Sequence, residues 1–172
     1  MKKYEFTGET KTVPFLFKDV TLHRIQAITS FANVVAGELG GWIEKEENLS
    51  HKGDAWVYGD AVVSGDAVVS GNAVVSGNAV VSENAWVRGN AVVSGDAVVF
   101  SVRHVLVIGP IGSRNAFTTF YHDKDNEITV QCGCFIGKID KFLEKVTQTH
   151  CDSKYALVYR AAVEVAKLQI EL

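Results

Sequence analysis

The chain lacks the features that several classes of protein require. Its three cysteines, Cys132, Cys134 and Cys151, are an odd number with no pairing framework, which argues against a disulfide-stapled scaffold and favours a reducing compartment. It also lacks an excess of positive charge, since 17 lysines and arginines stand against 20 acidic residues and give a net charge of −3. We therefore expect no binding to long nucleic acids.

Long hydrophobic runs are missing as well. No stretch approaches the roughly 18 uncharged residues that a membrane span needs. The two lysines at the N-terminus are not followed by the apolar run of a signal peptide. We expect no contact with membranes and a cytoplasmic location. With 172 residues, 47% of them hydrophobic, the chain is long enough for one domain or two small ones.

A hexapeptide repeat fills the middle of the sequence. Residues 53 to 100 consist of eight units without an insertion: GDAWVY, GDAVVS, GDAVVS, GNAVVS, GNAVVS, ENAWVR, GNAVVS and GDAVVF. So short a period predicts a solenoid. In an extended unit, Ala and the second Val point to one side and the residue between them to the other. Gly followed by Asp or Asn supplies the corner, because these residues readily enter the left-handed region.

This pattern resembles the left-handed β-helix of hexapeptide-repeat proteins, in which three hexapeptides form one triangular coil. The resemblance implies just under three coils. The inward small residues are then Ala55, Ala61, Ala67, Ala73, Ala79, Ala85, Ala91 and Ala97, each followed two positions later by an inward Val. The outward residues stack as Trp56, Val74 and Val92 on one face, Val62, Val80 and Val98 on a second, and Val68 and Trp86 on the third.

Apolar stripes on outer faces usually mark buried contacts. These stripes can be covered by the flanking segments of the same chain, folded back over the coil, or by neighbouring subunits. We expect a homo-oligomer, with a trimer favoured. Its interface is predicted to include Val62, Val80, Val98 and Phe100. The alternative is that the outward β-branched residues only serve strand propensity.

The flanks define three parts of a mainly β protein. Residues 1–46 form an N-terminal β segment with strand-like runs at 4–13 and 21–31, and residues 47–100 form the β-helix, with 47–52 as a degenerate capping unit. Residues 101–172 form an α+β unit of three strands, at 102–111, 116–122 and 127–133. Two helices follow, at 138–150 and from about Ser153. Six residues are expected on or near the buried face of the second helix: Tyr155, Leu157, Val158, Ala162, Val165 and Ala166. We expect this unit to pack on the last coil, beginning with Phe100.

The segment GGWIEKEENLS, residues 40–50, followed directly by hexapeptides, resembles the sequences of a group of phage and prophage proteins that are commonly uncharacterised. For a phage protein, the expected location is the cytoplasm of the host cell. The hexapeptide coil itself resembles that of acyltransferases, whose catalytic histidine lies on or near a coil. Here the eight units contain no histidine and no inserted loop. His51 and His104 flank the coil and are the candidate general bases, or else capping residues.

The segment best suited to binding a phosphate is GPIGSRN, residues 109–115. Its candidate ligand-binding residues are Gly112, Ser113, Arg114 and Asn115, because glycine allows close approach of the backbone and arginine offers a planar fork for a phosphate or carboxylate. The alternative is a plain hairpin turn. Aromatic stacking on Trp56 or Trp86, with Arg88 nearby, would complete such a site. The spacing of Cys132, Cys134, His150 and Cys151 is poor for zinc, so no metal or cofactor is expected.

These observations favour a non-enzymatic, oligomeric binding protein of phage type. Its ligand is expected to be small and anionic, with a nucleotide signal of host antiviral defence as the leading example. Two alternatives stay open. One is an inhibitor or scaffold that docks onto a host protein, and the other is a hexapeptide-type acyltransferase.

Overall fold

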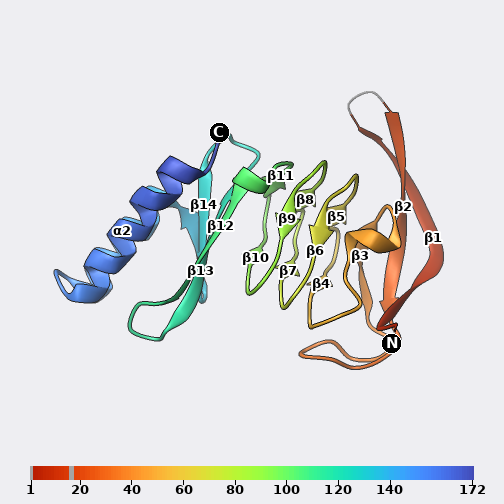
Figure 1. The fold of residues 1–172 in the computed structure, drawn as a ribbon, viewed down its shortest axis with the longest axis horizontal. Coiled ribbons are helices and arrows are strands. Elements are labelled where there is room, and N and C mark those ends of the chain that lie inside the picture. Colours follow the sequence, from red (N-terminus) through yellow and green to blue (C-terminus); the bar gives the residue numbers. More distant parts are fainter. Residues whose placement is uncertain (1, 16–17) are drawn as a thin grey trace.

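The computed structural model describes residues 2–15 and 18–172. Residues 1, 16 and 17 of the expected N-terminal segment lie outside this description. Three parts follow one another along the long axis of the molecule (Figure 1): an N-terminal hairpin, a short solenoid and a C-terminal unit of strands and helices. No helix of the described residues is both long and apolar enough to cross a membrane.

The repeat forms a three-sided coil with one hexapeptide on each side. One side contains β5 (Val62–Val63), β8 (Val80–Val81) and β11 (Val98–Val99); the second contains β4 (Trp56–Val57), β7 (Val74–Val75) and β10 (Val92–Val93); the third contains β6 (Val68–Val69) and β9 (Trp86–Val87). Strands of one side pair in parallel, for example Val62 with Val80. This arrangement, of about three coils, is the architecture of the left-handed β-helix. The predicted stacking of the outward residues is therefore confirmed.

The interior of the coil contains the alanines and valines that the periodicity assigned to it. All eight alanines and the eight valines two positions later are buried. Seven corners have a glycine with φ between +62° and +72°, and the eighth has Glu83 at φ +54°. The glycine is required at Gly77, because a Cβ there would lie 2.8 Å from the Gly95 amide nitrogen of the next coil.

The first side of the solenoid begins earlier than the hexapeptides. Strands β1 (Tyr4–Phe15) and β2 (Lys18–Ala27) form an antiparallel hairpin, and β2 pairs with β3 (Leu39–Ile43). Strand β3 then pairs in parallel with β5, so that Trp42 lies opposite Val62. After the short 3-10 turn at Glu46–Asn48, Leu49 bridges to Val69 on the third side. The segment GGWIEKEENLS thus forms part of the first coil.

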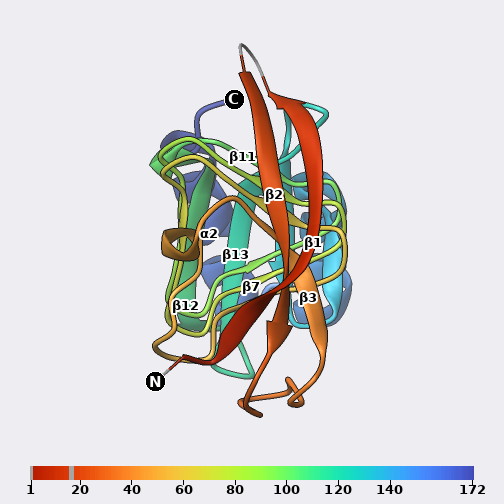
Figure 2. The same ribbon diagram turned by 90° about the vertical axis from the view of Figure 1, so that its right-hand side faces the viewer.

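The hairpin covers the N-terminal end of the coil (Figure 2). Tyr4 and Phe31 contact the Trp56 ring edge-on, at centroid distances of 6.1 and 5.4 Å. Lys3 is buried, and its Nζ donates to the carbonyls of Gly53 and Ala55 at 3.1 and 2.6 Å. Free backbone acceptors at the end of the coil are satisfied in this way, which also protects an open strand edge.

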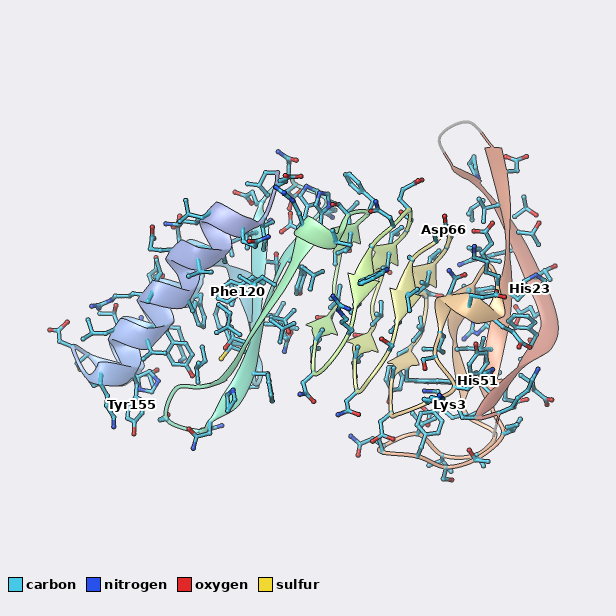
Figure 3. All side chains as sticks on the ribbon, in the orientation of Figure 1. Lys3, His23, His51, Asp66, Phe120 and Tyr155 are labelled. Carbon is cyan, nitrogen blue, oxygen red and sulfur yellow. The ribbon has the colours of Figure 1, made fainter. Side chains whose placement is uncertain are left out.

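The C-terminal unit is a four-stranded antiparallel sheet with two helices on one face (Figures 1 and 3). A 3-10 turn at Val102–His104 precedes β12 (Val105–Ile111), which is followed by β13 (Ala116–His122), β14 (Ile128–Cys132), β15 (Phe135–Lys138), α1 (Ile139–His150) and α2 (Lys154–Gln169). The prediction of three strands was wrong by one, because β15 has only four residues and too little sequence to show a strand pattern. Phe120 lies in the core between sheet and helices, edge-on to Phe142.

The phase of the second helix also differs from the prediction. Its buried residues are Ala156, Tyr159, Ala162, Val163 and Ala166. Leu157 and Val165, which were expected on or near the buried face, are 59% and 48% exposed, and Val158 is exposed too. Ala162 and Ala166 are buried, as predicted. The helix is apolar on several faces, so composition alone did not indicate which face meets the sheet.

The C-terminal unit packs on the last coils through β13, as expected. The Val92 amide donates to Thr119 Oγ1 at 3.0 Å, and Ala97 bridges to Asp123. A small cavity of about 190 Å³ lies at this junction. Its charged groups already have partners, because Lys138 lies 2.6 Å from the buried Asp123 and Thr129 donates to the same carboxylate. The junction is a structural network.

Candidate ligand cavity in the C-terminal unit

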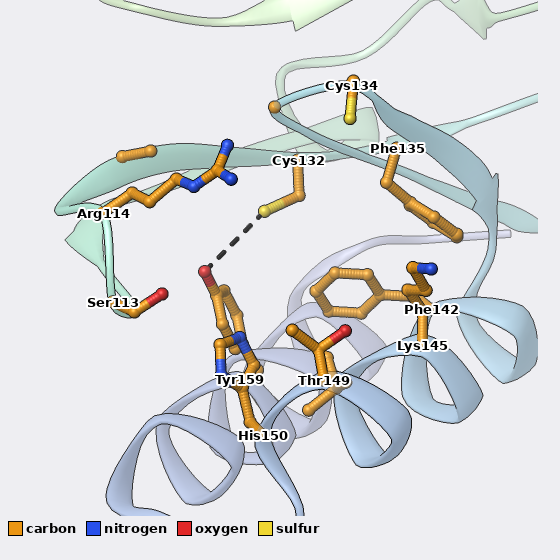
Figure 4. A pocket seen from close by; sticks show the side chains of 13 residues that line it. Ser113, Arg114, Cys132, Cys134, Phe135, Phe142, Lys145, Thr149, His150 and Tyr159 are labelled. Carbon is orange, nitrogen blue, oxygen red and sulfur yellow. Dashed lines mark hydrogen bonds between the residues drawn. The ribbon is translucent and has the colours of Figure 1, made fainter.

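A cavity of about 250 Å³ opens between the sheet and the helices of the C-terminal unit (Figure 4). Four segments line it: the β12–β13 turn, the β14–β15 turn, α1 and α2. Ser113 and Arg114, two of the four residues predicted from GPIGSRN, are part of the lining. The predicted ligand segment is therefore at the edge of a real concavity.

Gly112 and Asn115 shape the turn that presents Ser113 and Arg114. Their φ angles are +73° and +50°, and the Asn115 amide donates to the Gly112 carbonyl at 3.4 Å. A Cβ on Gly112 would lie 2.9 Å from Tyr159 Cε2 and closer still to Cζ and Oη. Gly112 thus allows Tyr159 of α2 to pack against the turn, and neither Gly112 nor Asn115 belongs to the cavity lining.

Polar groups gather at one end of the cavity. Arg114, Cys132 and Tyr159 lie near one another there (Figure 4), and the Cys132 thiol donates to Tyr159 Oη across 3.9 Å. Burial, together with the neighbouring Cys132 thiol, raises the pKa of the Tyr159 phenol to about 12, although the positive charge of Arg114 acts in the opposite direction. At neutral pH the phenol keeps its proton and can serve as a hydrogen-bond donor.

Aromatic and aliphatic side chains form the other end. The rings of Phe135 and Phe142 lie 5.4 Å apart, and Val146 adds an aliphatic surface. Lys145 and Thr149 lie on the same helix, with Lys145 beside these rings and Thr149 between Phe142 and His150 (Figure 4). His150 ends the helix and stacks on Tyr159 with a centroid distance of 5.7 Å.

Sequence reasoning missed most of this lining. Phe142, Lys145, Val146 and Thr149 follow the i, i+3, i+4, i+7 spacing of one helix face. The apolar residues at this spacing, Phe142 and Val146 among them, predict the helix itself, and the same spacing places Lys145 and Thr149 beside them. Tyr159 was missed because the predicted buried face of α2 did not include it.

The remaining predicted ligand residues do not line the cavity. Trp56 has no exposed surface, because Tyr4 and Phe31 of the N-terminal segment pack on it, so the expectation of an accessible aromatic face there is wrong. Trp86 is 46% exposed, and Arg88 stacks on its ring at 4.4 Å. This pair lies on a side of the solenoid, away from Ser113 and Arg114.

The predicted interface residues on the solenoid are partly covered by the chain itself. Val62 packs against Val20, Leu22 and Trp42, all from the N-terminal segment. Val80 and Val98 remain half-buried, and Phe100 is exposed but contacts the His104 ring at 4.3 Å. The flanking segments therefore provide at least part of the cover.

Both candidate general bases make packing contacts at the ends of the solenoid. His51 stacks on Tyr4 at 4.3 Å and accepts a hydrogen bond from the Lys3 amide. Lys3 and His51 lie close together at the N-terminal end of the solenoid (Figure 3). His104 is buried beside His122, with ring centroids 4.7 Å apart. Burial, and then the neighbouring His122, lower the pKa of His104. These are the contacts of capping residues.

The cysteines do not form a metal site with His150. Cys132, Cys134 and His150 border the same cavity. Across residues 2–15 and 18–172, no group of three or more histidine, cysteine or acidic side chains could hold a metal ion. All three cysteines are free.

The fold defines the class of the protein: a hexapeptide-repeat β-solenoid joined to an α+β unit. No protein-family model matches the chain. A segment of 62 residues is 37% identical to a protein of Escherichia coli (strain K12) described as the uncharacterized acetyltransferase YdcK. The match covers 34% of this chain, and the chain spans only 19% of that relative's length. The similarity agrees with a hexapeptide-repeat coil.

Proposed function

We propose that the protein is a non-enzymatic binding protein that holds a small anionic ligand in the cavity of its C-terminal unit. One observation carries this proposal. Arg114 and Lys145 both reach the cavity, and neither has a carboxylate within ion-pair distance among the described residues. Eight other lysines and arginines of the described chain form ion pairs, as Arg103 does with Glu171 and Lys124 with Asp96. Lys11, Arg88 and Lys154 instead stack on aromatic rings.

The lining supports an anion in this position. An apolar wall lowers the local dielectric constant and strengthens the attraction between a guanidinium group and an anion. The guanidinium of Arg114 offers parallel donors that fit a phosphate or a carboxylate. Tyr159 and Ser113 add hydroxyl donors from two sides. The arrangement suits recognition, because no nucleophile in it is activated by a hydrogen-bonded base among the described contacts.

The finer identity of the ligand follows from the resemblance of GGWIEKEENLS to phage proteins. On that basis a nucleotide signal of host antiviral defence, withdrawn from its receptor by binding, is the first candidate for the anion. The solenoid would then hold the C-terminal units of an oligomer, with a trimer favoured, at fixed spacing. Native mass spectrometry gives the subunit number directly.

A second candidate function is acyl transfer, which the similarity to YdcK favours. Turnover of acetyl-coenzyme A by the wild-type chain would establish it, and loss of that turnover in a His51→Ala or His104→Ala variant that keeps its fold would assign the general base. Retention of that turnover in both variants would remove the two histidines from any acyl-transfer mechanism. The binding proposal expects no turnover.

Native mass spectrometry of the protein purified from phage-infected cells tests the binding proposal. We expect an added mass in the native spectrum that is released under denaturing conditions. Arg114→Gln should lose this mass. Arg88→Gln is the matched control, because it removes an arginine from the solenoid surface, and it should retain the mass. No releasable mass in the wild type, or equal retention in Arg114→Gln, would contradict the proposal.

A further inference from the structure

The cavity is divided into two chemically different ends, and this division restricts the ligand. Arg114, Cys132 and the Tyr159 hydroxyl lie at one end, while the rings of Phe135 and Phe142 lie at the other (Figure 4). A bare inorganic ion placed beside Arg114 would leave the aromatic end in contact with water. A ligand that fills the space must therefore carry an apolar group next to its charge.

The aromatic end has the geometry of a platform for a ring. Phe135 is half-buried on β15, and Phe142 is almost fully buried beneath it on α1. Their planes are inclined by 51° at a centroid distance of 5.4 Å, so the two rings present adjoining surfaces of different orientation. Aromatic pairs favour such offset or edge-on arrangements, and a third ring can add to them.

The size of the cavity limits how large the apolar group can be. Its volume of about 250 Å³ lies just below the roughly 300–1,000 Å³ of most small-molecule sites. This volume favours one ring system and one anionic group, and it disfavours a long acyl or pantetheine chain. Each end of the cavity has a cation, Arg114 at one and Lys145 beside the rings at the other. Only the first end combines its cation with a phenol hydroxyl, so the anion should contact Arg114.

We propose that the cavity binds an aryl anion: a phosphate or carboxylate attached closely to one aromatic ring. The anion contacts Arg114 and accepts a hydrogen bond from the Tyr159 hydroxyl. The ring lies on Phe135 and Phe142. The inference rests on the proposed binding of a small anion and specifies the ligand class of the same cavity. It departs from the nucleotide candidate, in which a ribose separates the ring from the phosphate.

Isothermal titration calorimetry with three probes at constant ionic strength tests this inference. Phenyl phosphate carries both groups, inorganic phosphate carries only the anion, and phenol carries only the ring. We expect phenyl phosphate to bind at least tenfold more tightly than either of the others, a difference of about 1.4 kcal/mol. Equal affinities for phenyl phosphate and inorganic phosphate would overturn the inference and leave the proposed function standing.

Two other outcomes bear on the proposed function itself. If phenol binds as tightly as phenyl phosphate, the anion contributes nothing and both proposals fail. If none of the three probes binds, the aryl-anion class is wrong; a releasable mass that still depends on Arg114 would then preserve the proposed function. Because all three titrations use the wild-type chain, the result does not depend on whether a variant folds.

A pair of phenylalanine variants locates the ring. Phe135→Leu should weaken phenyl phosphate about tenfold and leave inorganic phosphate unchanged. Phe117→Leu is the matched control, since Phe117 is exposed on β13 and does not line the cavity. An equal loss of phenyl phosphate affinity in both variants, or no loss in Phe135→Leu, would contradict the position of the ring.

Discussion

Replacing Gly112 with alanine should destabilise the C-terminal unit through two separate effects. The first is backbone strain, because φ is +73° and an L-residue in the left-handed region costs about 1–2 kcal/mol. The second is steric, since the new Cβ would overlap the phenol of Tyr159. The ring has to leave its site or the turn has to move away from α2.

The structure also limits the size of the second effect. It cannot exceed the cost of losing the packing of Tyr159 altogether, which for a buried aromatic ring is about 3–5 kcal/mol. Gly133→Ala separates the two effects. Gly133 also borders the cavity and has φ +59°, but a Cβ there meets nothing within 4 Å. Gly133→Ala should therefore show the strain alone, and Gly112→Ala at least 1 kcal/mol more by the same estimate.

Urea unfolding, monitored by far-UV circular dichroism, gives the loss of unfolding free energy for Gly112→Ala and for Gly133→Ala. The test is sharper in a Tyr159→Ala background, where Gly112→Ala should cost only the strain because its steric partner is gone. Such non-additivity is the signature of direct contact. Equal costs for Gly112→Ala and Gly133→Ala, or strict additivity with Tyr159→Ala, would refute the packing of Tyr159 against the turn.

Three further predictions concern the solenoid and its two ends. Glu83→Gly should stabilise the protein by on the order of 0.5–1 kcal/mol, because it removes a left-handed non-glycine corner at φ +54°; a lower urea midpoint would contradict this. The folded state lowers the pKa of His104, so the unfolded chain binds more protons and stability should fall as pH drops below about 6.5. His104→Phe should flatten this slope in thermal melts, and an unchanged slope would count against the buried neutral histidine. Burial lowers the pKa of Lys3 from 10.5 to about 8, so stability should rise between pH 8 and 10, and Lys3→Met should abolish that rise.

The solenoid could be predicted from sequence because every hexapeptide repeats the same local instructions. Ala61 and Val63 point inward by strand geometry alone, and Gly77 is required by its corner. The register between strands also follows from the repeat. Stacking every third hexapeptide places equivalent positions opposite each other, as Val62 and Val80 are. The pattern does not predict the first strand of the solenoid, β3. There Gly41 and Ile43 occupy the inward positions that Ala and Val occupy in the hexapeptides.

The C-terminal unit was less predictable because its packing is not repeated. The strand Phe135–Lys138 has only four residues, and its pairing with β14 depends on a tertiary contact. The face of α2 is decided by Tyr159, which fits beside Gly112, and not by the apolar pattern. The sequence therefore predicts only one edge of the candidate cavity, the ligand-binding residues Ser113 and Arg114. Its other walls come together only when the helices fold over the sheet.

Two-dimensional NMR of the ¹⁵N-labelled protein during titration with phenyl phosphate tests the central claim most directly. The account predicts that the amides of Ser113, Arg114, Gly133 and Thr149 shift with a common dissociation constant and that those around Trp86 and Arg88 do not. Shifts centred on Trp86 and Arg88, with none at the β12–β13 turn, would contradict the placement of the ligand site in the C-terminal unit.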